Sequence, residues 1–174
     1  MSRLPPSVLI AIVMMCSAHP VAAQSGDDDG TRFSVGASLG FIDNPGGVSL
    51  GFEAPVEITR NFAVGPWLTL GLADDFLNLT ATANARYYFD LSDSGRMARL
   101  RPFVQGGLGL DYTDDDVSRI DEVNFLVATG LGIEYAIDDN VALTSQAMFN
   151  IIPYARRGRS FTASVQLLGV RYRF

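Results

Sequence analysis

The sequence predicts an all-β fold, an eight-stranded antiparallel up-and-down transmembrane β-barrel, and two observations lead to this prediction. After residue 32 the chain divides into eight apolar-rich runs in which apolar and polar side chains alternate with the period of two that a strand imposes. Clusters of Asp, Asn, Gly, Ser and Pro separate the runs over distances too short for crossover helices, so consecutive strands should pair antiparallel. Eight such strands remove their exposed edges by closing into a barrel.

The N-terminal segment predicts export. Residues 1–23 have the features of a signal peptide for the Sec route: Arg3, a short apolar core and a small-residue cleavage site that ends at Ala23. Residues 24–31 are polar and predict a disordered tail. The barrel domain is then expected over residues 32–174.

The composition limits the possible functions. The 174 residues include 13 basic side chains, all Arg, against 19 acidic ones, a net charge of −6 at pH 7, so no nucleic-acid partner is expected. The single Cys and the single His, Cys16 and His19, fall within the predicted signal peptide. The mature chain therefore lacks the groups that Cys and Ser-His nucleophiles and His-ligated zinc sites need, and we expect no enzyme activity, cofactor or metal.

The first four runs show the alternation in order. In residues 33–41, large apolar side chains alternate with Ser and Gly. In residues 48–59 every apolar side chain larger than proline falls on an even position, and residues 62–72 form the next apolar-rich run. Residues 77–89 place Leu, Ala, Tyr and Phe on odd positions, with Asn, Thr, Arg and one further Tyr between them. A helix would not sort the side chains in this way.

The last four runs complete the predicted barrel. They cover residues 100–112, 124–135, 141–151 and 161–174. The final run is the least regular, and it predicts a β-bulge near Leu167.

Glycine predicts which face of the sheet is outside. With the apolar side chains directed outward, only Gly106 among the strand glycines faces out. The inward ones are Gly36, Gly40, Gly51, Gly65, Gly71, Gly107, Gly109, Gly130, Gly132 and Gly169. The interior of an eight-stranded barrel is only just wide enough to be filled by side chains, so glycines belong there and rows of Phe, Leu, Val and Tyr do not. The apolar face is therefore the outer one. Such an exterior needs lipid to cover it, and the competing interpretation is a soluble periplasmic, lipocalin-like ligand-binding barrel.

Outward aromatic residues gather near both ends of the runs, as in the two interfacial girdles of membrane barrels. One set comprises Phe62, Tyr87, Phe89, Tyr135, Tyr172 and Phe174. The other comprises Phe41, Tyr112, Phe125, Phe149 and Phe161.

Charged residues also fall on the inward face, whereas Asp is concentrated in the turns. The inward charges are Glu53, Glu57, Arg86, Arg101, Glu134, Arg171 and Arg173. Buried charges need partners, so we predict an Arg/Glu network in the periplasmic half of the lumen, with Glu53 nearer the middle, joined by Gln105, Gln146 and Asn150, with Trp67 adding bulk. Two functions remain open for it: a polar filling that closes the barrel, or a gate whose ion pairs exchange partners in a small, low-conductance, porin-like channel.

The predicted external connections contain two charged clusters. The acidic one is Asp114, Asp115, Asp116, Asp121 and Glu122, and the basic one is Arg156, Arg157 and Arg159. Acidic clusters bind divalent cations, and arginines bind phosphates such as those of lipopolysaccharide. Ordinary solvated loops are the favoured interpretation, because the Asp spacing fits no defined ligand loop.

Three segments resemble a known family, the small OmpA-like and OmpX-like outer-membrane β-barrels of Gram-negative bacteria. These are the Gly-rich stretch 101–109, the hairpin 130–141 and the ending Tyr172-Arg173-Phe174. The resemblance implies an outer-membrane location among lipid and lipopolysaccharide, a monomer, and a role in envelope integrity or surface interaction. It also implies that Tyr172 and Phe174 form the insertion signal read by the barrel-assembly machinery.

Two differences from that family narrow the expectation. No peptidoglycan-binding domain follows Phe174, so cell-wall tethering is not carried over. Lipid A-modifying barrels of similar size use a catalytic His, which the mature chain lacks.

Overall fold

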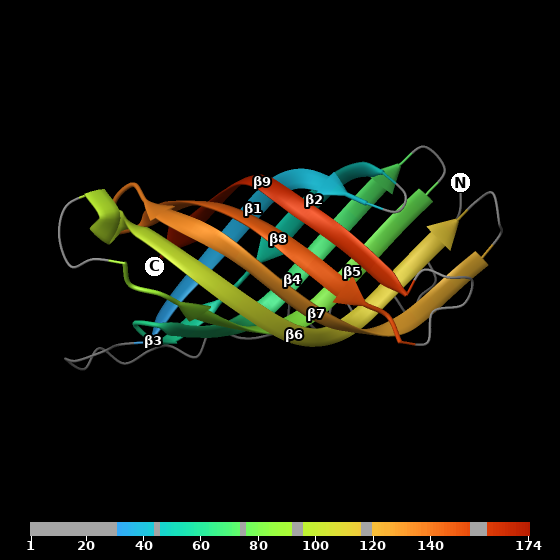
Figure 1. Cartoon of the computed structure of the whole chain (residues 1–174), viewed down its shortest axis with the longest axis horizontal. Coiled ribbons are helices and arrows are strands. Elements are labelled where there is room, and N and C mark those ends of the chain that lie inside the picture. Colours follow the sequence, from blue (N-terminus) through green and yellow to red (C-terminus); the bar gives the residue numbers. More distant parts are fainter. Residues whose placement is uncertain (1–30, 44–45, 74–75, 92–95, 116–119, 154–159) are drawn as a thin grey trace. The chain divides into compact units, whose positions relative to one another are not determined.

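The strands form a closed antiparallel sheet, which the computed structural model shows as a barrel (Figure 1). The structure describes residues 31–43, 46–73, 76–91, 96–115, 120–153 and 160–174, so the predicted signal peptide and all but Thr31 of the predicted tail lie outside the described residues. The elements are β1 (Arg32–Ile42), β2 (Gly47–Glu53), β3 (Val56–Thr59), β4 (Phe62–Ala73), β5 (Phe76–Tyr88), the 3-10 helix η1 (Arg96–Arg99), β6 (Leu100–Asp115), β7 (Ile120–Ala136), β8 (Val141–Ile151) and β9 (Phe161–Arg173).

Pairing between the first and last strands closes the barrel. From β4 to β9 each strand pairs with the next, and β9 also pairs with β1. We call the end where β1 begins and β9 ends the terminal end, and the opposite end the loop end. In the part of the chain that is described, no helix is long and apolar enough to span a membrane.

Strands β2 and β3 share one position in the wall, so nine strands make an eight-stranded barrel. Glu53 pairs with Trp67 and Val56 pairs with Val64, so two residues separate the pairs on each strand and the register continues across the gap. Pro55 lies in this gap and has no N–H to donate, which interrupts the hydrogen-bond ladder. The sequence pattern predicted this segment as one uninterrupted strand.

The predicted irregularity near Leu167 is confirmed as a β-bulge. Leu168 pairs with Leu39, but Gln166 pairs with the next residue, Gly40, so Leu167 has no partner on β1. The pairing with β8 shifts at the same place. Leu167 and Leu168 both face outward, and the extra residue keeps the polar side chains on either side of the bulge inward.

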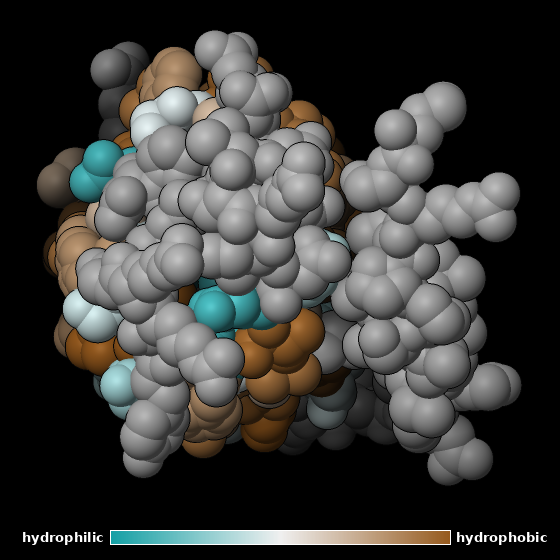
Figure 2. All heavy atoms as spheres, turned by 90° about the vertical axis from the view of Figure 1, so that its right-hand side faces the viewer, coloured by the Kyte–Doolittle hydropathy of each residue, from teal (hydrophilic) through white to brown (hydrophobic). Residues whose placement is uncertain are grey.

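Burial confirms that the apolar face is the outer one. Along β8, buried and half-buried side chains alternate residue by residue. The exposed large side chains on the strands are almost all Leu, Val, Ile, Phe and Tyr. Seen from the loop end, the visible described residues at the edge are mostly brown and apolar, with a few teal or pale ones among them, and a hydrophilic teal patch lies nearer the centre (Figure 2).

Glycine leaves room for two aromatic rings inside the barrel. A Cβ added to Gly51 would lie 2.8 Å from ring atoms of Trp67, and one added to Gly132 would lie 2.5 Å from the ring of Phe103. Outward-facing Gly106 differs, because the nearest atom to an added Cβ would be 3.7 Å away. The inward glycines therefore make space that larger inward side chains fill.

Aromatic side chains surround both ends, as predicted, and all but one of the predicted set are exposed or half-buried. All six at the terminal end are exposed, and Phe174 contacts both Phe33 and Tyr172 through its ring. At the loop end Phe149 stacks on Phe161. Tyr112 has the outward register that was predicted, opposite Leu79 and two residues after exposed Leu110, although it is itself only 6% exposed.

Candidate functional site

The structure brings the seven predicted lumen charges together in the half of the barrel nearest the terminal end. They come from β2, β3, β5, β6, β7 and β9 and share the inward face of the wall. Their side chains are buried or nearly so: Glu53, Glu57, Arg86, Arg101, Glu134, Arg171 and Arg173. We call these seven residues the lumen network.

Glu53 joins two arginines from different parts of the wall. Its Oε2 accepts from Nη2 of Arg86 at 2.7 Å, and its Oε1 accepts from Nε of Arg171 at 2.8 Å. Glu53 and Arg171 flank the same β1 residue, Gly36, whose missing side chain lets them meet. A Cβ at Gly36 would lie 2.9 Å from two atoms of the Glu53 side chain.

Glu134 is the most shared carboxylate of the network. It is fully buried, and it pairs with Arg171 through one oxygen and with Arg173 through the other. Nη1 of Arg101 lies 3.8 Å from the second oxygen. Arg173 also reaches Glu57, with its Nε 3.2 Å from Oε1. Together with Glu53, these pairs form one continuous chain of alternating charges across the lumen.

Two of the three predicted amide partners belong to the network. Gln105 Oε1 accepts from Nε of Arg86 at 2.8 Å, and Gln146 Oε1 accepts from Nη2 of Arg86 at 3.3 Å. The expectation for Asn150 was wrong: it pairs with Ala128, four residues beyond the Gln146 position on β8. At about 3.4 Å per residue that places it roughly 14 Å further along the strand toward the loop end.

Tyr88 is a network member that the sequence analysis did not name. Its hydroxyl accepts hydrogen bonds from Arg86 and Arg171 and lies 3.5 Å from Oε2 of Glu134. The signal was present, because Tyr88 lies two residues after Arg86 and therefore on the same face of β5. Phe103 pairs with Tyr88 across the strands and was missed in the same way.

Asp111 is a buried carboxylate that was not predicted among the inward charges, although it lies within the predicted run 100–112. It lies in β6 near the loop end and is only 2% exposed. Asn78 Nδ2 donates to its Oδ1 at 2.7 Å, Thr80 Oγ1 to the same oxygen at 3.0 Å, and Thr113 Oγ1 to Oδ2 at 3.0 Å. These hydrogen-bond partners of Asp111 are neutral.

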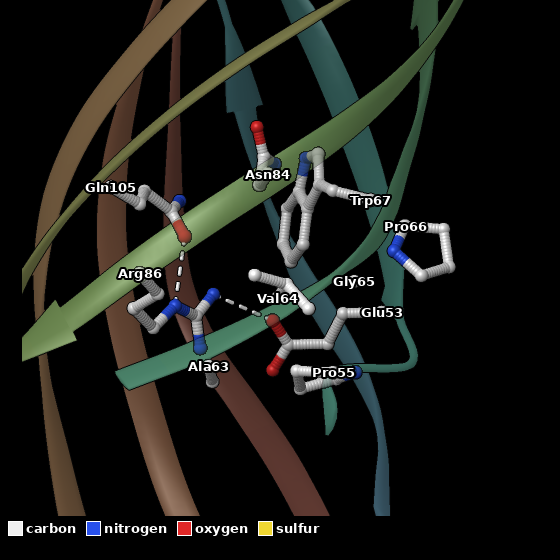
Figure 3. Close-up of a pocket in the computed structure, with 10 residues that line it drawn as sticks. All are labelled: Glu53, Pro55, Ala63, Val64, Gly65, Pro66, Trp67, Asn84, Arg86 and Gln105. Carbon is white, nitrogen blue, oxygen red and sulfur yellow. Dashed lines mark hydrogen bonds and ion pairs between the residues drawn. The ribbon is translucent and has the colours of Figure 1, made fainter. Parts of the chain in front are cut away.

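A cavity of about 10 Å³ lies beside the Arg86–Glu53 pair (Figure 3). Its lining includes Trp67, Asn84 and Gln105, and Oδ1 of Asn84 is buried without a hydrogen-bond partner among the described residues. Space of this size holds about one water molecule. The described interior beside the ion pair is therefore filled by side chains apart from a gap of molecular water size.

Neither charged cluster predicted for the loops gives a site in the described structure. Arg156, Arg157 and Arg159 lie outside the described residues, as does Asp116. Among the acidic residues, only Glu122 has a described side chain, and it is half-buried. No group of three or more His, Cys, Asp or Glu in the described part of the chain could hold a metal ion.

The sequence matches the model of the outer membrane protein beta-barrel domain over residues 8–174. The chain belongs to this family. It is thus a multi-pass outer-membrane β-barrel. This membership and the apolar exterior decide against the soluble, lipocalin-like interpretation.

Three solved structures illustrate the likeness in fold within this outer-membrane family. Neisserial surface protein A is 21% identical, with a TM-score of 0.63 over 83% of this chain and 97% of that one. The N-terminal β-barrel domain of Pseudomonas aeruginosa OprF is 18% identical, with a TM-score of 0.60 over 83% and 99%. Ail of Yersinia pestis, in complex with a heparin analogue, is 12% identical, with a TM-score of 0.52 over 83% and 97%. No curated protein matches the sequence.

Proposed function

We propose that the protein is a closed structural barrel of the outer membrane, which serves envelope integrity or surface interaction and does not conduct ions or catalyse a reaction. The observation that carries this proposal is the continuous chain of ion pairs across the lumen, from Arg86 through Glu53, Arg171 and Glu134 to Arg173. A non-catalytic role is supported by the absence of Cys and His from residues 24–174.

The distribution of charge along the lumen also supports a closed barrel. The half near the terminal end contains four arginines and three glutamates, whereas buried Asp111 has neutral hydrogen-bond partners near the loop end. A cation crossing the lumen would be repelled by the excess positive charge near the terminal end. An anion would be repelled by the carboxylate of Asp111 near the loop end. In surroundings of low dielectric constant such repulsion is only weakly screened. Neither sign of ion has a favourable path.

A small gated channel is the second candidate, and the sharing of carboxylates favours it. Glu53 contacts two arginines and Glu134 contacts three, so a guanidinium could change its partner without leaving a carboxylate unpaired. Such exchange avoids the large cost of isolating a buried charge.

The partners follow from the location. We propose that the barrel is a monomer and that the C-terminal strand, with Tyr172 and Phe174, is recognised by the barrel-assembly machinery. The exposed aromatic ring of Phe174 beside Tyr172 supports this role. We also propose that the barrel contacts lipopolysaccharide, which its place in the outer membrane supports.

Planar-bilayer recording tests the closed barrel. The wild-type protein should give no steady conductance above the lipid background, and Arg86→Glu should open it, because Glu53 then faces a second carboxylate. Asp139→Asn, in an exposed turn outside the lumen, is the control and should stay silent. Steady wild-type openings that Arg86→Glu alters would establish the channel instead.

A further inference from the structure

The lumen network holds more arginines than carboxylates. Arg86, Arg101, Arg171 and Arg173 face Glu53, Glu57 and Glu134, so one guanidinium lacks a carboxylate of its own. A buried charge without compensation is costly in a protein interior. Something else in the described lumen must stabilise the fourth arginine.

Arg101 is the arginine with the weakest carboxylate contact. Its Nη1 lies 3.8 Å from Glu134 Oε1, an oxygen that already pairs with Arg173. Its Nη2 donates to the backbone carbonyl of Arg60, and its side chain is 15% exposed. The excess charge is therefore assigned to Arg101, at the mouth of the lumen.

Two aromatic rings lie beneath two of the arginines in a reciprocal arrangement. Tyr88 on β5 and Phe103 on β6 are a cross-strand pair, with their ring centroids 5.6 Å apart and the planes 63° from parallel. The guanidinium of Arg101 lies 4.2 Å from the centroid of Tyr88, and that of Arg86 lies 4.2 Å from the centroid of Phe103. Each arginine thus covers the ring diagonal to it.

The sequence explains this geometry. Strand β5 contains Arg86 and, two residues later, Tyr88, while β6 contains Arg101 and, two residues later, Phe103. In antiparallel strands with Tyr88 opposite Phe103, each arginine is the diagonal neighbour of the other strand's ring. Diagonal neighbours about 7–8 Å apart at Cα are within reach of long and aromatic side chains. We call Tyr88 and Phe103 the aromatic pair.

We propose that the aromatic pair positions the lumen network by compensating its excess charge, with the π-face of Tyr88 holding Arg101 where a fourth carboxylate is missing. A cation over an aromatic face is attracted by the ring quadrupole, most strongly when both are removed from water. The proposal deepens the proposed function, since it explains how a network of unequal charge stays closed. Tyr88 and Phe103 are positioning residues, which act through the arginines.

A double-mutant cycle tests the proposal. Urea unfolding of the full-length mature barrel in lipid vesicles can be followed by the fluorescence of Trp67, the only Trp and a buried one. Tyr88→Leu should lower the folding equilibrium constant about tenfold through the lost cation–π contact, in addition to any packing loss. In an Arg101→Gln background, which removes the excess charge, that tenfold part should disappear.

Further variants separate the ring from the hydroxyl and from simple packing. Tyr88→Phe keeps the π-face and should retain the coupling to Arg101, whereas Tyr87→Leu, on the lipid-facing side of the same strand, should show none. If Tyr88→Leu does not refold, the double variant with Arg101→Gln should. Equal effects of Tyr88→Leu in both backgrounds would overturn the proposal, as would failure of the double variant to refold.

The outcome is independent of the bilayer recording. A wild-type channel would refute the closed barrel, yet the cycle would still report whether the ring and Arg101 are coupled. If chloride or phosphate stabilised the wild type and Arg101→Gln abolished that effect, a bound anion would be compensating the charge, which would overturn the role of the aromatic pair.

Discussion

Among substitutions in the lumen network, we expect Glu134→Gln to lower the stability of the barrel most. The side chain is fully buried and contacts Arg171, Arg173 and Arg101. The variant keeps the size and shape of the side chain but leaves four arginines facing two carboxylates, Glu53 and Glu57. We expect a large loss of stability with no change in the strand pairing.

The magnitude follows from the cost of breaking a buried ion pair. Removing one partner of such a pair costs about 3–5 kcal/mol, because the other charge remains buried. At about 1.36 kcal/mol per factor of ten, the folding equilibrium constant should fall by roughly two to four powers of ten. A domain is typically stable by about 5–15 kcal/mol, so the variant should still fold. Adding Arg101→Gln should recover part of the loss, since three arginines then face two carboxylates.

Urea unfolding in lipid vesicles, followed by Trp67 fluorescence, measures this loss. The control is Glu122→Gln, outside the network in the β6–β7 hairpin, which should change stability by no more than about 0.5 kcal/mol. A loss below about 1 kcal/mol for Glu134→Gln, or no recovery on adding Arg101→Gln, would refute the reasoning, because Glu134 would then not be holding an excess of buried positive charge.

Three further predictions rest on separate features. Gly65→Ala should cost about 1–3 kcal/mol in the same unfolding assay, since its Cβ would lie 2.6 Å from the carbonyl oxygen of Ala54 and from Cα of Pro55, whereas Gly106→Ala should stay within about 0.5 kcal/mol. Leu108→Arg, on the lipid-facing side of β6, should cost up to about 2–4 kcal/mol, while an equal stability to wild type would contradict the lipid-facing assignment. Deleting Phe174 should lower the amount of barrel in the outer membrane several-fold, measured by membrane fractionation, and leave refolding into vesicles nearly unchanged; loss of both would indicate a structural role instead.

The strands and their faces could be predicted because both depend on local alternation. Every residue two positions along a strand shares its face, so placing Arg86 in the lumen also places Tyr88 there, and the same rule applied to β6 would have found Asp111. The break at Pro55 was readable too, since proline has no N–H for the ladder. Tyr88, Asp111 and the break at Pro55 therefore all follow from local sequence.

The partners within the network could not be predicted from local pattern. Glu53 and Arg171 are 118 residues apart, and they meet because β2 and β9 both pair with β1 at Gly36. That coincidence depends on the stagger with which the barrel closes, which alternation does not specify. Asn150 shows the same limit, because its inward direction was predictable but its level along the axis was not.

The ion pairs that fill the lumen also help to hold the barrel closed. Arg171, on the closing strand β9, is bound by Glu53 of β2 on one side and by Glu134 of β7 on the other. The ion pairs that fill the lumen therefore also join the last strand to strands on both sides of the seam between β1 and β9. Two of these pairs depend on closure, Glu53 with Arg171 and Glu57 with Arg173, because an open sheet would leave β9 far from β2 and β3. Substitutions in the network should accordingly lower the stability of the whole barrel and not merely widen its lumen.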